Sequence, residues 1–488
     1  MHGVVFAIAE LDRSARHFRY QVTLVPPLAL LGLRRGVRIF QALSVPAIVE
    51  QLLNEADLSN DTRRWRINRT YAPRDYCVQY NESTLGFIER ILAEEGIHYH
   101  FAHGPEQTLL ILADGPEGLD TLPALPVKMQ AGLAAEAHAI HRFSLGPQVR
   151  AATVSLRDVD FTRPDLLLRP QSVSLPTADC ANEQALEDYA WPGPFTSQAQ
   201  GKQLSDLTLA RHRHNREQAQ GASDSPQLMA GHYQPLSEHP ESAYNQPWLI
   251  TQLSYQGKQP HVLGELADGQ SASHQHKYQN SFTAQPWTRP YKPPCPPKPQ
   301  VPGQQSAIVT GPPGEEIYCD EYGRVKVQFY WDREGQLDEK SSTWLRVSQG
   351  WAGNGYGQFI LPRVGMEVLV SFINGDPDRP IITGCLFNGN NAVPYALPEH
   401  NTRSTFKTAS SPARADNLGK GNELRFEDKA GSEEIYLHAA KDYQERIANN
   451  SHSHIVNDRE QLIEGQHTIE VRGEQHHTVH GIRHWHAK

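Results

Sequence analysis

The most regular pattern of apolar and polar positions lies at the end of the chain, where it repeats every eight residues. Written from residue 455, the sequence reads IVNDREQL, IEGQHTIE, VRGEQHHT and VHGIRHWH. The first position of each octad is aliphatic, and the third position of the last three is glycine: Ile455, Ile463, Gly465, Val471, Gly473, Val479 and Gly481. Because eight is an even number, each repeat returns its aliphatic side chain to the same face of an extended strand. The pattern therefore predicts a repeated β structure with an apolar inner face.

Eight residues are too few for one chain to close a β coil around a core. Three chains, each contributing eight residues to a turn, would close it and would cover the strand edges, which otherwise favour aggregation. Glycine would let the backbone bend or pack closely at each corner. We therefore expect an intertwined three-chain β-prism over residues 435–488. An ordinary hairpin sheet is the alternative, but this segment has no Asn-Gly or Asp-Gly turn.

Residues 1–285 show strand-like alternation with a few helices. The segment Phe18–Val25 alternates as a half-buried strand does. Apolar stripes at helical spacing predict helices over Val45–Ala56 and Ser83–Glu95, and Gly96 stands where a helix C-cap belongs. This part of the chain is therefore expected to be mainly β.

Two further segments separate the first part of the chain from the rest. The polar segment 198–220 ends at Gly221 and is expected to form a surface helix. Residues 286–303 are dense in proline, which cannot enter a helix or a central strand. We interpret them as a rigid linker between domains. A ligand for an SH3-type domain is the alternative use of such a segment.

Short strands at close spacing are expected between residues 304 and 391. They are predicted at Arg324–Phe329, Trp344–Val347, Phe359–Leu361, Val368–Phe372 and Ile381–Leu386, with glycine-rich turns between them. Such spacing is typical of a small closed barrel, and the OB fold is favoured. OB barrels often bind single-stranded nucleic acid through aromatic residues in a basic groove. Acidic residues are at least as frequent as basic ones here, so no nucleic acid is expected as a partner.

Composition narrows the class of protein further. The chain has 488 residues, which predicts two to four domains, and its 36 Gly and 35 Pro favour strands and turns. A formal net charge of −9 gives no support to binding of nucleic acid or anionic membranes. No apolar run is long enough to predict a membrane-spanning helix, so no stable membrane insertion is expected. Five cysteines without a CxxC pair favour reduced thiols in a cytoplasm. The segment Met1–Glu10 has no basic region before an apolar core, so export would need a route other than a signal peptide.

Several long motifs resemble the VgrG spike proteins of the bacterial type VI secretion system. They occur in the order of that family, at Arg74–Ser83, Glu94–Tyr99, Gly323–Phe329, Trp351–Gly353 and Asn374–Gly384. The resemblance implies a homotrimer like the hub and needle of contractile phage tails. Two hub-type β-barrels would form a base, the OB barrel a neck, and the β-prism a shaft.

The same resemblance implies domain limits and partners. The base would cover 1–285, the OB neck 304–391, a connector 392–434 and the prism 435–488. The implied partners are the Hcp tube, a PAAR-repeat tip protein, baseplate components and secreted effectors. The spike would assemble in the bacterial cytoplasm and be ejected into a target cell or the medium.

Two features depart from the family. Its members normally begin several dozen residues earlier, so the first barrel is expected to be truncated at its N-terminus. The octads also stop in mid-repeat, so a shortened shaft is expected.

An enzyme is the alternative class of protein. No Gly-x-Ser-x-Gly, His-Glu-x-x-His or Walker motif is present. Only about 45 residues separate Asn391 from Ile435, whereas a wall-cutting domain would need at least roughly 50. We therefore expect no catalytic residues and no cofactor.

The 24 histidines raise the question of a metal site. His98, His100 and His103 could place two imidazoles on one strand face, but strand alternation explains their spacing and no cysteine or clear carboxylate partner stands beside them. His484 and His486 are a second candidate. On a threefold axis this pair would be tripled, and six imidazoles could hold an octahedral Fe, Ni or Zn ion. The alternative is that the shaft simply continues past them.

The octad pattern makes a direct prediction about Val471. The substitution Val471→Asp would place three carboxylates together in the apolar core, where like charges without solvent are strongly unfavourable. We expect loss of the trimer and a lower melting temperature, measured by light scattering and thermal unfolding. A variant that keeps both properties would show that this position does not face inward.

Overall fold

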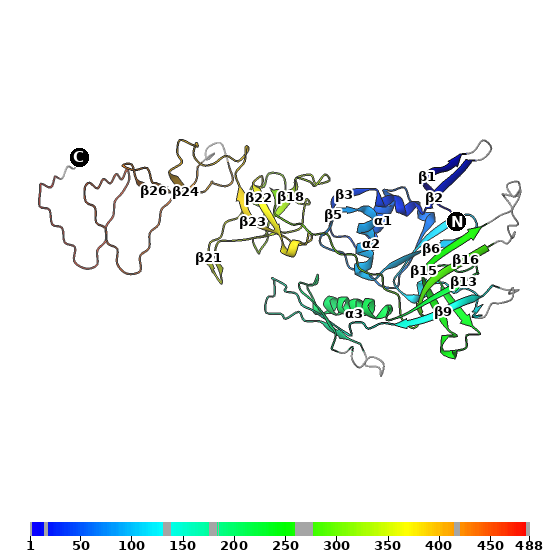
Figure 1. Ribbon diagram of the computed structural model, residues 1–488. Helices are drawn as coiled ribbons and strands as arrows, with labels where there is room; N and C mark the ends of the chain where they lie inside the picture. Colours follow the sequence, from blue (N-terminus) through cyan, green and yellow to red (C-terminus); the bar gives the residue numbers. More distant parts are fainter. Residues whose placement is uncertain are drawn as a thin grey trace. The chain divides into compact units, whose positions relative to one another are not determined.

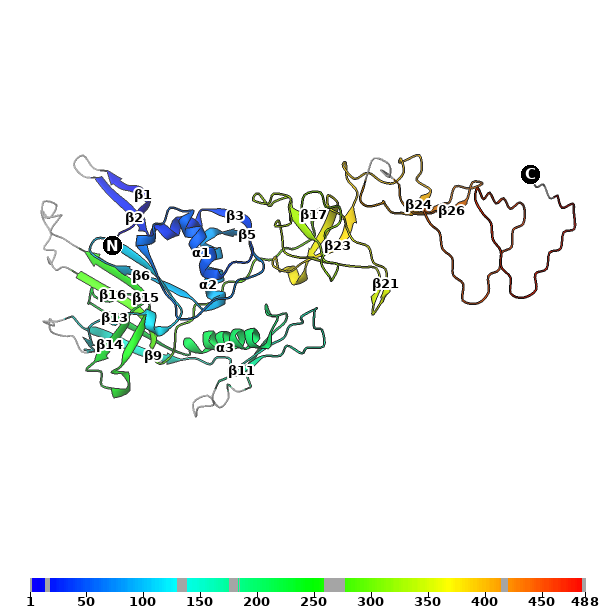
Figure 2. The ribbon, with the colours of Figure 1, turned by 180° about the vertical axis from the view of Figure 1, so that it is seen from behind.

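The computed structural model describes residues 2–13, 18–129, 138–174, 183, 185–258, 277–413 and 420–484 (Figures 1 and 2). The described part is mainly β with few helices, as the sequence predicts. It divides into two compact units, Met1–Val393 and Pro394–Lys488, which are described separately below.

The first part of the first unit combines three small sheets with two helices. The strands pair as β1 (Val4–Arg13) with β2 (Phe18–Val25), β3 (Arg35–Phe40) with β5 (Cys77–Ser83), and β4 (Arg63–Arg66) with β7 (Thr108–Ala113) and then β6 (His98–His103). The helices α1 (Val45–Asn54) and α2 (Thr84–Glu95) contact each other. Their apolar stripes are buried in one core with Phe40, Leu110 and Leu112.

Both predicted helices are confirmed, with local signals at their ends. The Ser44 and Ser83 side chains cap the N-termini of α1 and α2 by accepting hydrogen bonds from the backbone amides of Ala47 and Gly86. Helix α2 ends at Gly96, which has a left-handed φ of 75°. Helix α1 ends at Asn54, two residues before the expected Ala56.

The next part of the unit is built on a six-stranded sheet. Its order is β8 (Leu125–Pro126), β14 (Tyr233–Ser237), β15 (Pro247–Lys258), β16 (Lys277–Pro286), β13 (Glu217–Ser223) and β9 (Ile140–Pro147). A second sheet joins β11 (Gln171–Val173), β10 (Thr153–Leu156) and β12 (Glu187–Ala190), and helix α3 (Gln198–His214) packs against β10 and β11. The predicted helix over 198–220 is therefore too long. Residues 217–223 instead pair with β9 and β16.

Residues 305–386 form a five-stranded sheet with its own apolar core. The order is β18 (Lys326–Phe329), β17 (Gln305–Thr310), β22 (Glu367–Phe372), β23 (Pro380–Leu386) and β19 (Arg346–Val347). A small hairpin joins β20 (Ala352–Gly353) and β21 (Tyr356–Gly357). The strand predicted over Phe359–Leu361 is wrong, since these residues form no strand and Phe359 is exposed. The backbone amide of Ile360 donates to Oε1 of Gln349 at 3.0 Å, and the carbonyl oxygen of Ile360 accepts from Nε2 of the same side chain at 3.0 Å.

The remaining elements of the described chain are short. The 3-10 helices lie at η1 (Pro27–Gly32), η2 (Asn60–Thr62), η3 (Pro116–Gly118), η5 (Ser242–Tyr244) and η7 (Ile373–Gly375). Residues 287–304 contain neither helix nor strand. None of the described helices is long and apolar enough to span a membrane.

The second unit contains one antiparallel sheet, in the order β24 (Arg403–Lys407), β25 (Glu423–Glu427) and β26 (Glu434–His438). From residue 439 to residue 484 the chain forms no helix or strand and runs in wide bends (Figure 1). A strand needs hydrogen-bonded neighbours, and this segment has no strand partner among the described residues of its own chain.

The end of helix α2 generates a testable prediction. A Cβ atom at Gly96 would lie 2.5 Å from Cδ1 of Leu207, and the left-handed φ disfavours any L side chain. Gly96→Ala should therefore lower the free energy of unfolding by at least about 1 kcal/mol, measured by chemical denaturation. Gly303→Ala is the control, since nothing lies within 4 Å of a Cβ there. Equal stabilities of the two variants would contradict the prediction.

Candidate functional site: a charged junction and an exposed tail

Helix α2 and the end of strand β5 carry three acidic side chains that two arginines neutralise. The guanidinium of Arg74 contacts Glu94 at 2.6 Å and Glu95 at 2.7 Å. Arg90, which is fully buried, contacts Glu82 at 2.6 Å and Glu94 at 2.9 Å. Glu94 is thus shared between two cations. Burial by itself would raise the pKa of Glu94, but Arg74 and Arg90 outweigh burial and lower this pKa to about 2.

The proline-rich segment carries a lysine into the same region. The ammonium of Lys298 contacts Asp376 at 2.6 Å and Asp378 at 2.5 Å, both in the turn that precedes β23. The other carboxylate oxygen of Asp378 accepts a hydrogen bond from the backbone amide of Val78 at 2.7 Å. We call the five-stranded sheet domain of residues 305–386 the OB-like domain, and the part of the first unit before residue 287 the base. Asp378 therefore joins the OB-like domain both to β5 of the base and to the proline-rich segment. We call this arrangement around Lys298, Asp376 and Asp378 the charged junction.

A second set of contacts joins the OB-like domain to the base around Asp158 and Phe161. Arg379 forms an ion pair with the buried Asp158 and donates to the carbonyl oxygen of Gly193 at 2.7 Å. The ring of Phe161 lies against the guanidinium groups of Arg346 at 4.8 Å and Arg324 at 5.2 Å. The domain is therefore held at two separate places.

The proline-rich segment is also fixed to the C-terminus of α2. Lys292 donates to the carbonyl oxygens of Gly96 at 3.3 Å and Asp114 at 2.7 Å. Arg211 of α3 donates to the carbonyl oxygens of Ala93 and Glu94. Cations at a helix C-terminus satisfy its last carbonyls and complement the helix dipole. The segment therefore acts as a strap bonded to both domains, which goes beyond the rigid linker expected from its prolines.

Three of the five motifs that carried the family resemblance contribute residues to the contacts at and around this junction. Arg74, Glu94, Asp376, Asp378 and Arg379 all belong to them. Lys292 and Lys298 were missed by the sequence analysis. The signal that could have found them is the presence of lysines within a proline-dense segment, where a simple spacer needs no charge.

The octad residues are exposed in the single chain. The aliphatic first positions Ile455, Ile463, Val471 and Val479 are between 40% and 53% exposed. The other aliphatic residues of the octads are more exposed: Ile469 is 62% exposed, and Val456, Leu462 and Ile482 are at least 84% exposed. Nothing lies within 4 Å of a Cβ atom built at Gly465, Gly473 or Gly481. The first positions therefore differ from their neighbours in exposure, and their inward assignment stays a prediction.

The structure places the histidine candidates in different surroundings. His484 is exposed, and His486 lies outside the described residues. His98 and His100 are buried on the same face of β6, as strand alternation predicts, whereas His103 is exposed. Within the described residues there is no group of three or more His, Cys, Asp or Glu placed to hold a metal ion.

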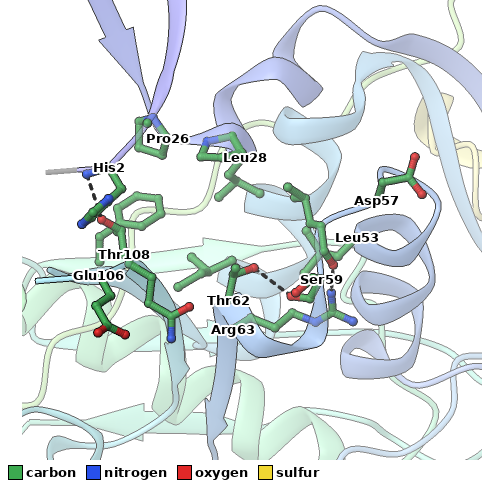
Figure 3. Close-up of a pocket in the computed structure, with 16 residues that line it drawn as sticks. His2, Pro26, Leu28, Leu53, Asp57, Ser59, Thr62, Arg63, Glu106 and Thr108 are labelled. Carbon is green, nitrogen blue, oxygen red and sulfur yellow. Dashed lines mark hydrogen bonds between the residues drawn. The ribbon is translucent and has the colours of Figure 1, made fainter. Parts of the chain in front are cut away.

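The base also contains a cavity of about 410 Å³ (Figure 3). Its polar lining groups are engaged locally: Thr62 donates to the carbonyl oxygen of Ser59 at 2.7 Å, and Arg63 pairs with Glu50. Leu28, Leu53 and other apolar side chains form much of the remaining wall. This lining has no paired nucleophile and base, so it does not point to catalysis.

Comparison with known proteins identifies the family. Residues 1–261 match the phage tail baseplate hub (GPD) family, which is more than half of the chain. The chain belongs to the phage tail baseplate hub family. Residues 318–387 match the type VI secretion system/phage-baseplate injector OB domain. Residues 404–487 match the bacteriophage T4 gp5 C-terminal trimerisation domain.

Individual relatives confirm the resemblance to VgrG. The chain is 47% identical to the type VI secretion system spike protein VgrG4b of Pseudomonas aeruginosa over 472 residues, covering 95% of this chain and 57% of that protein. It is 38% identical to the actin cross-linking toxin VgrG1 of Vibrio cholerae, covering 99% of this chain and 43% of that protein. The chain thus spans about half the length of these relatives.

A solved structure confirms the hub-type fold. It is the E. coli c3393 protein, a type VI secretion component described as structurally similar to T4 gp27 and gp5. The TM-score is 0.55 at 22% identity, covering 79% of this chain and 83% of that chain. The predicted fold class is therefore confirmed.

The charged junction predicts a strong effect of removing its lysine. Lys298→Met would leave Asp376 and Asp378 without their shared cation. Because the three side chains are between 15% and 27% exposed, the cost should be less than that of a fully buried pair, which is about 3–5 kcal/mol. We expect a lower unfolding midpoint and faster proteolysis within residues 287–304. Lys202→Met is the control, because its pair with Asp206 is about half exposed and is expected to contribute less than about 1 kcal/mol. If the two variants behaved alike, the junction would not hold the domains together.

The buried histidines predict a loss of stability in mild acid. Burial lowers the pKa of both His98 and His100 to about 4. For His98, the nearby His100 and Lys292 lower the pKa further, and Asp114 opposes them. For His100, His232 and Arg66 lower the pKa further, and Asp120 opposes them. Because the unfolded chain binds these protons first, stability should fall as the pH drops from about 6.5 to 4, by on the order of 3 kcal/mol for each histidine.

A double substitution tests this explanation. Neither ring nitrogen of His98 or His100 has a hydrogen-bond partner among the described residues, so phenylalanine at both positions sacrifices no hydrogen bond. The double variant should lose less stability between pH 7 and pH 4 than the wild type, measured by chemical denaturation. The exposed control His452→Phe should keep the wild-type pH dependence. An unchanged dependence in the double variant would rule these two groups out.

Proposed function

We propose that this chain is the subunit of a homotrimeric spike that a type VI secretion machine drives into a target cell. The observation that carries the proposal is the coincidence of two features in the tail. The segment matched to a trimerisation domain, residues 404–487, is also the segment whose repeated aliphatic residues are exposed and unpaired in the single chain. Three copies supply the missing strand neighbours and bury the aliphatic face.

The proposed organisation follows the chain from base to shaft. Residues 1–285 form the hub base, 286–303 the strap, 304–391 the OB neck, 392–434 a connector and 435–488 the start of the prism. The charged junction then has a mechanical role, because a force along the spike passes between base and neck through the groups that join them.

The proposed partners follow the family. The base would sit on the Hcp tube, a PAAR-repeat protein would cap the shaft, and baseplate components and secreted effectors would attach to the trimer. Assembly in the bacterial cytoplasm would be followed by ejection into a target cell or the medium. Binding of nucleic acid and stable membrane insertion are not part of the proposal.

A metal site at His484 and His486 remains a proposal. In a trimer these residues would be tripled around the axis, and six imidazoles suit an octahedral ion. Metal analysis of the purified trimer should find one ion per three chains, and its absence would contradict the proposal.

A structural role is also proposed in preference to an enzymatic one. Relatives are named as spike proteins, and one relative is named as an actin cross-linking toxin. This chain covers 43% of that toxin's length, so the named activity belongs to the relative. The described residues bring no catalytic group together in the cavity of the base.

Light scattering after gel filtration tests the proposal. A trimer should have three times the mass of one 54.7 kDa chain. Val471→Asp should reduce this mass, whereas Arg472→Asp adds a carboxylate at the neighbouring position, predicted to face outward, and should preserve it. A monomeric wild-type chain would overturn the proposed function.

A further inference from the structure

Five aromatic rings form a continuous row inside the first unit. The ring centres of His232 and His100 lie 5.6 Å apart, and those of His100 and His98 lie 6.4 Å apart. Tyr291 continues the row at 5.6 Å from His98, and His214, the last residue of α3, lies 5.3 Å from Tyr291. The four histidines are each at most 8% exposed. We call this arrangement the ring row.

The ring row lies where two parts of the base meet. β6 is an edge strand of its sheet, and its Tyr99 and Phe101 pack against the core that contains α1 and α2. Because side chains alternate along a strand, His98 and His100 point to the other side of β6. There His100 meets His232, the residue before β14 of the six-stranded sheet. The row therefore forms a contact between the first part of the base and the six-stranded sheet.

The two central rings have no polar partner at this contact. Neither ring nitrogen of His98 or His100 has a hydrogen-bond partner among the described residues. The packing is also tight, since a Cβ atom built at Gly231 would lie 2.4 Å from Cβ of His100. A ring that gained a proton here would be a buried cation without an acceptor, which is strongly unfavourable.

The charged groups that face the ring row add to this penalty. Those that carry or can gain a positive charge are Lys292 of the strap, Arg66 of β4, His103 of β6, and Arg150, Arg211 and His212 near His214. The carboxylates are Asp114 and Asp120. Asp114 accepts hydrogen bonds from two backbone amides and from the hydroxyl of Tyr71, and Asp120 pairs with Arg66. Both carboxylates are thus already engaged with other groups.

We propose that the ring row is a pH-sensitive latch, which holds the two parts of the base together at neutral pH and releases them when His98 and His100 gain protons in mild acid. Each part has an apolar core of its own, so the two can separate without unfolding. In the separated form the rings reach water, which removes the penalty on their charge. The inference concerns the base of a single chain and does not depend on the proposed trimer.

The direction of the pH effect follows from which form binds protons first. Burial lowers the pKa of His98 and His100 to about 4 in the closed form, whereas an exposed histidine titrates near about 6.5. The open form therefore binds more protons, and the closed form loses stability as the pH falls from about 6.5 to about 4. Between pH 7 and pH 5, each ring should raise the population of the open form at least about tenfold.

Residues 114–124 can report the opening, because they connect the two parts. The carbonyl oxygen of Gly118 accepts from Arg66 of β4 at 3.1 Å, and the carbonyl oxygen of Asp120 accepts from the amide of Tyr233 in β14 at 2.9 Å. A segment bonded to both parts should become accessible to a protease when they separate. The rate of cleavage then follows the population of the open form.

Proteolysis of the full chain tests the proposal, with a protease active at both pH 5 and pH 7 and rates normalised to an unstructured peptide. Cleavage within 114–124 should be at least about tenfold faster at pH 5, whereas sites within α1 and β16 should stay protected. The double variant His98→Phe, His100→Phe should change less than about twofold between the two pH values. The exposed control His452→Phe should keep the wild-type acceleration.

Three results would overturn the latch. They are an equal rate at both pH values in the wild type, an unchanged acceleration in the double variant, and cleavage within α1 that accelerates in parallel, which would show that acid unfolds the base as a whole. If the double variant fails to fold, His100→Phe alone decides, since the loss of one ring should reduce the acceleration at least about tenfold. An acceleration equal to that of the wild type would then contradict the proposal.

Discussion

The charge pairs around helix α2 are the constraint on which the first unit depends. Arg74 and Arg90 neutralise Glu94 from two sides, and Lys298 stands close enough to contribute to the low pKa of Glu94 while it holds Asp376 and Asp378. The attraction within a buried ion pair offsets little more than the free energy lost when both charges leave water, so the net contribution of the pair to stability is small. Their value lies in geometry, since a buried charge tolerates only the arrangement that pairs it. The apolar core of the OB-like domain is complemented by Ile39 of the base, but apolar contact alone would allow the domain to slide.

The contacts within one chain and those proposed between chains use different chemistry for a physical reason. Within the chain, the covalent strap keeps the base and the neck close to each other at a high effective concentration. The contacts of the junction therefore need only to fix the orientation of the two domains. Separate chains have no such advantage. Their association must offset the loss of translational and rotational freedom, and burial of apolar surface is the interaction that supplies enough free energy. The exposed Ile455, Val471 and Leu437 agree with that requirement.

What the sequence predicted well was local. The limits of α2 follow from Ser83, an apolar stripe and Gly96, all within a few residues of one another. The end of α3 was missed because Glu217–Ser223 pairs with β16, more than fifty residues later. The strand predicted at Phe359 does not form, because the side chain of Gln349 takes the backbone hydrogen bonds of the neighbouring Ile360. The charged junction could not be predicted either, since Val78 and Asp378 meet across 300 residues and no local pattern records that contact.

The tail shows the opposite limit, in which the sequence is more informative than a single folded chain. Residues 439–484 form no strand in one copy, so the aliphatic residue at every eighth position packs into no core there. Backbone groups that have no partner within the chain must find water or another chain. The sheet β24–β26 differs, because its strands pair with one another within one copy, and only the outer edges of β24 and β26 lack a strand neighbour among the described residues. The aliphatic residues of the octads are therefore explained by their spacing in the sequence, and the sheet beside them by the strand pairs that one copy contains.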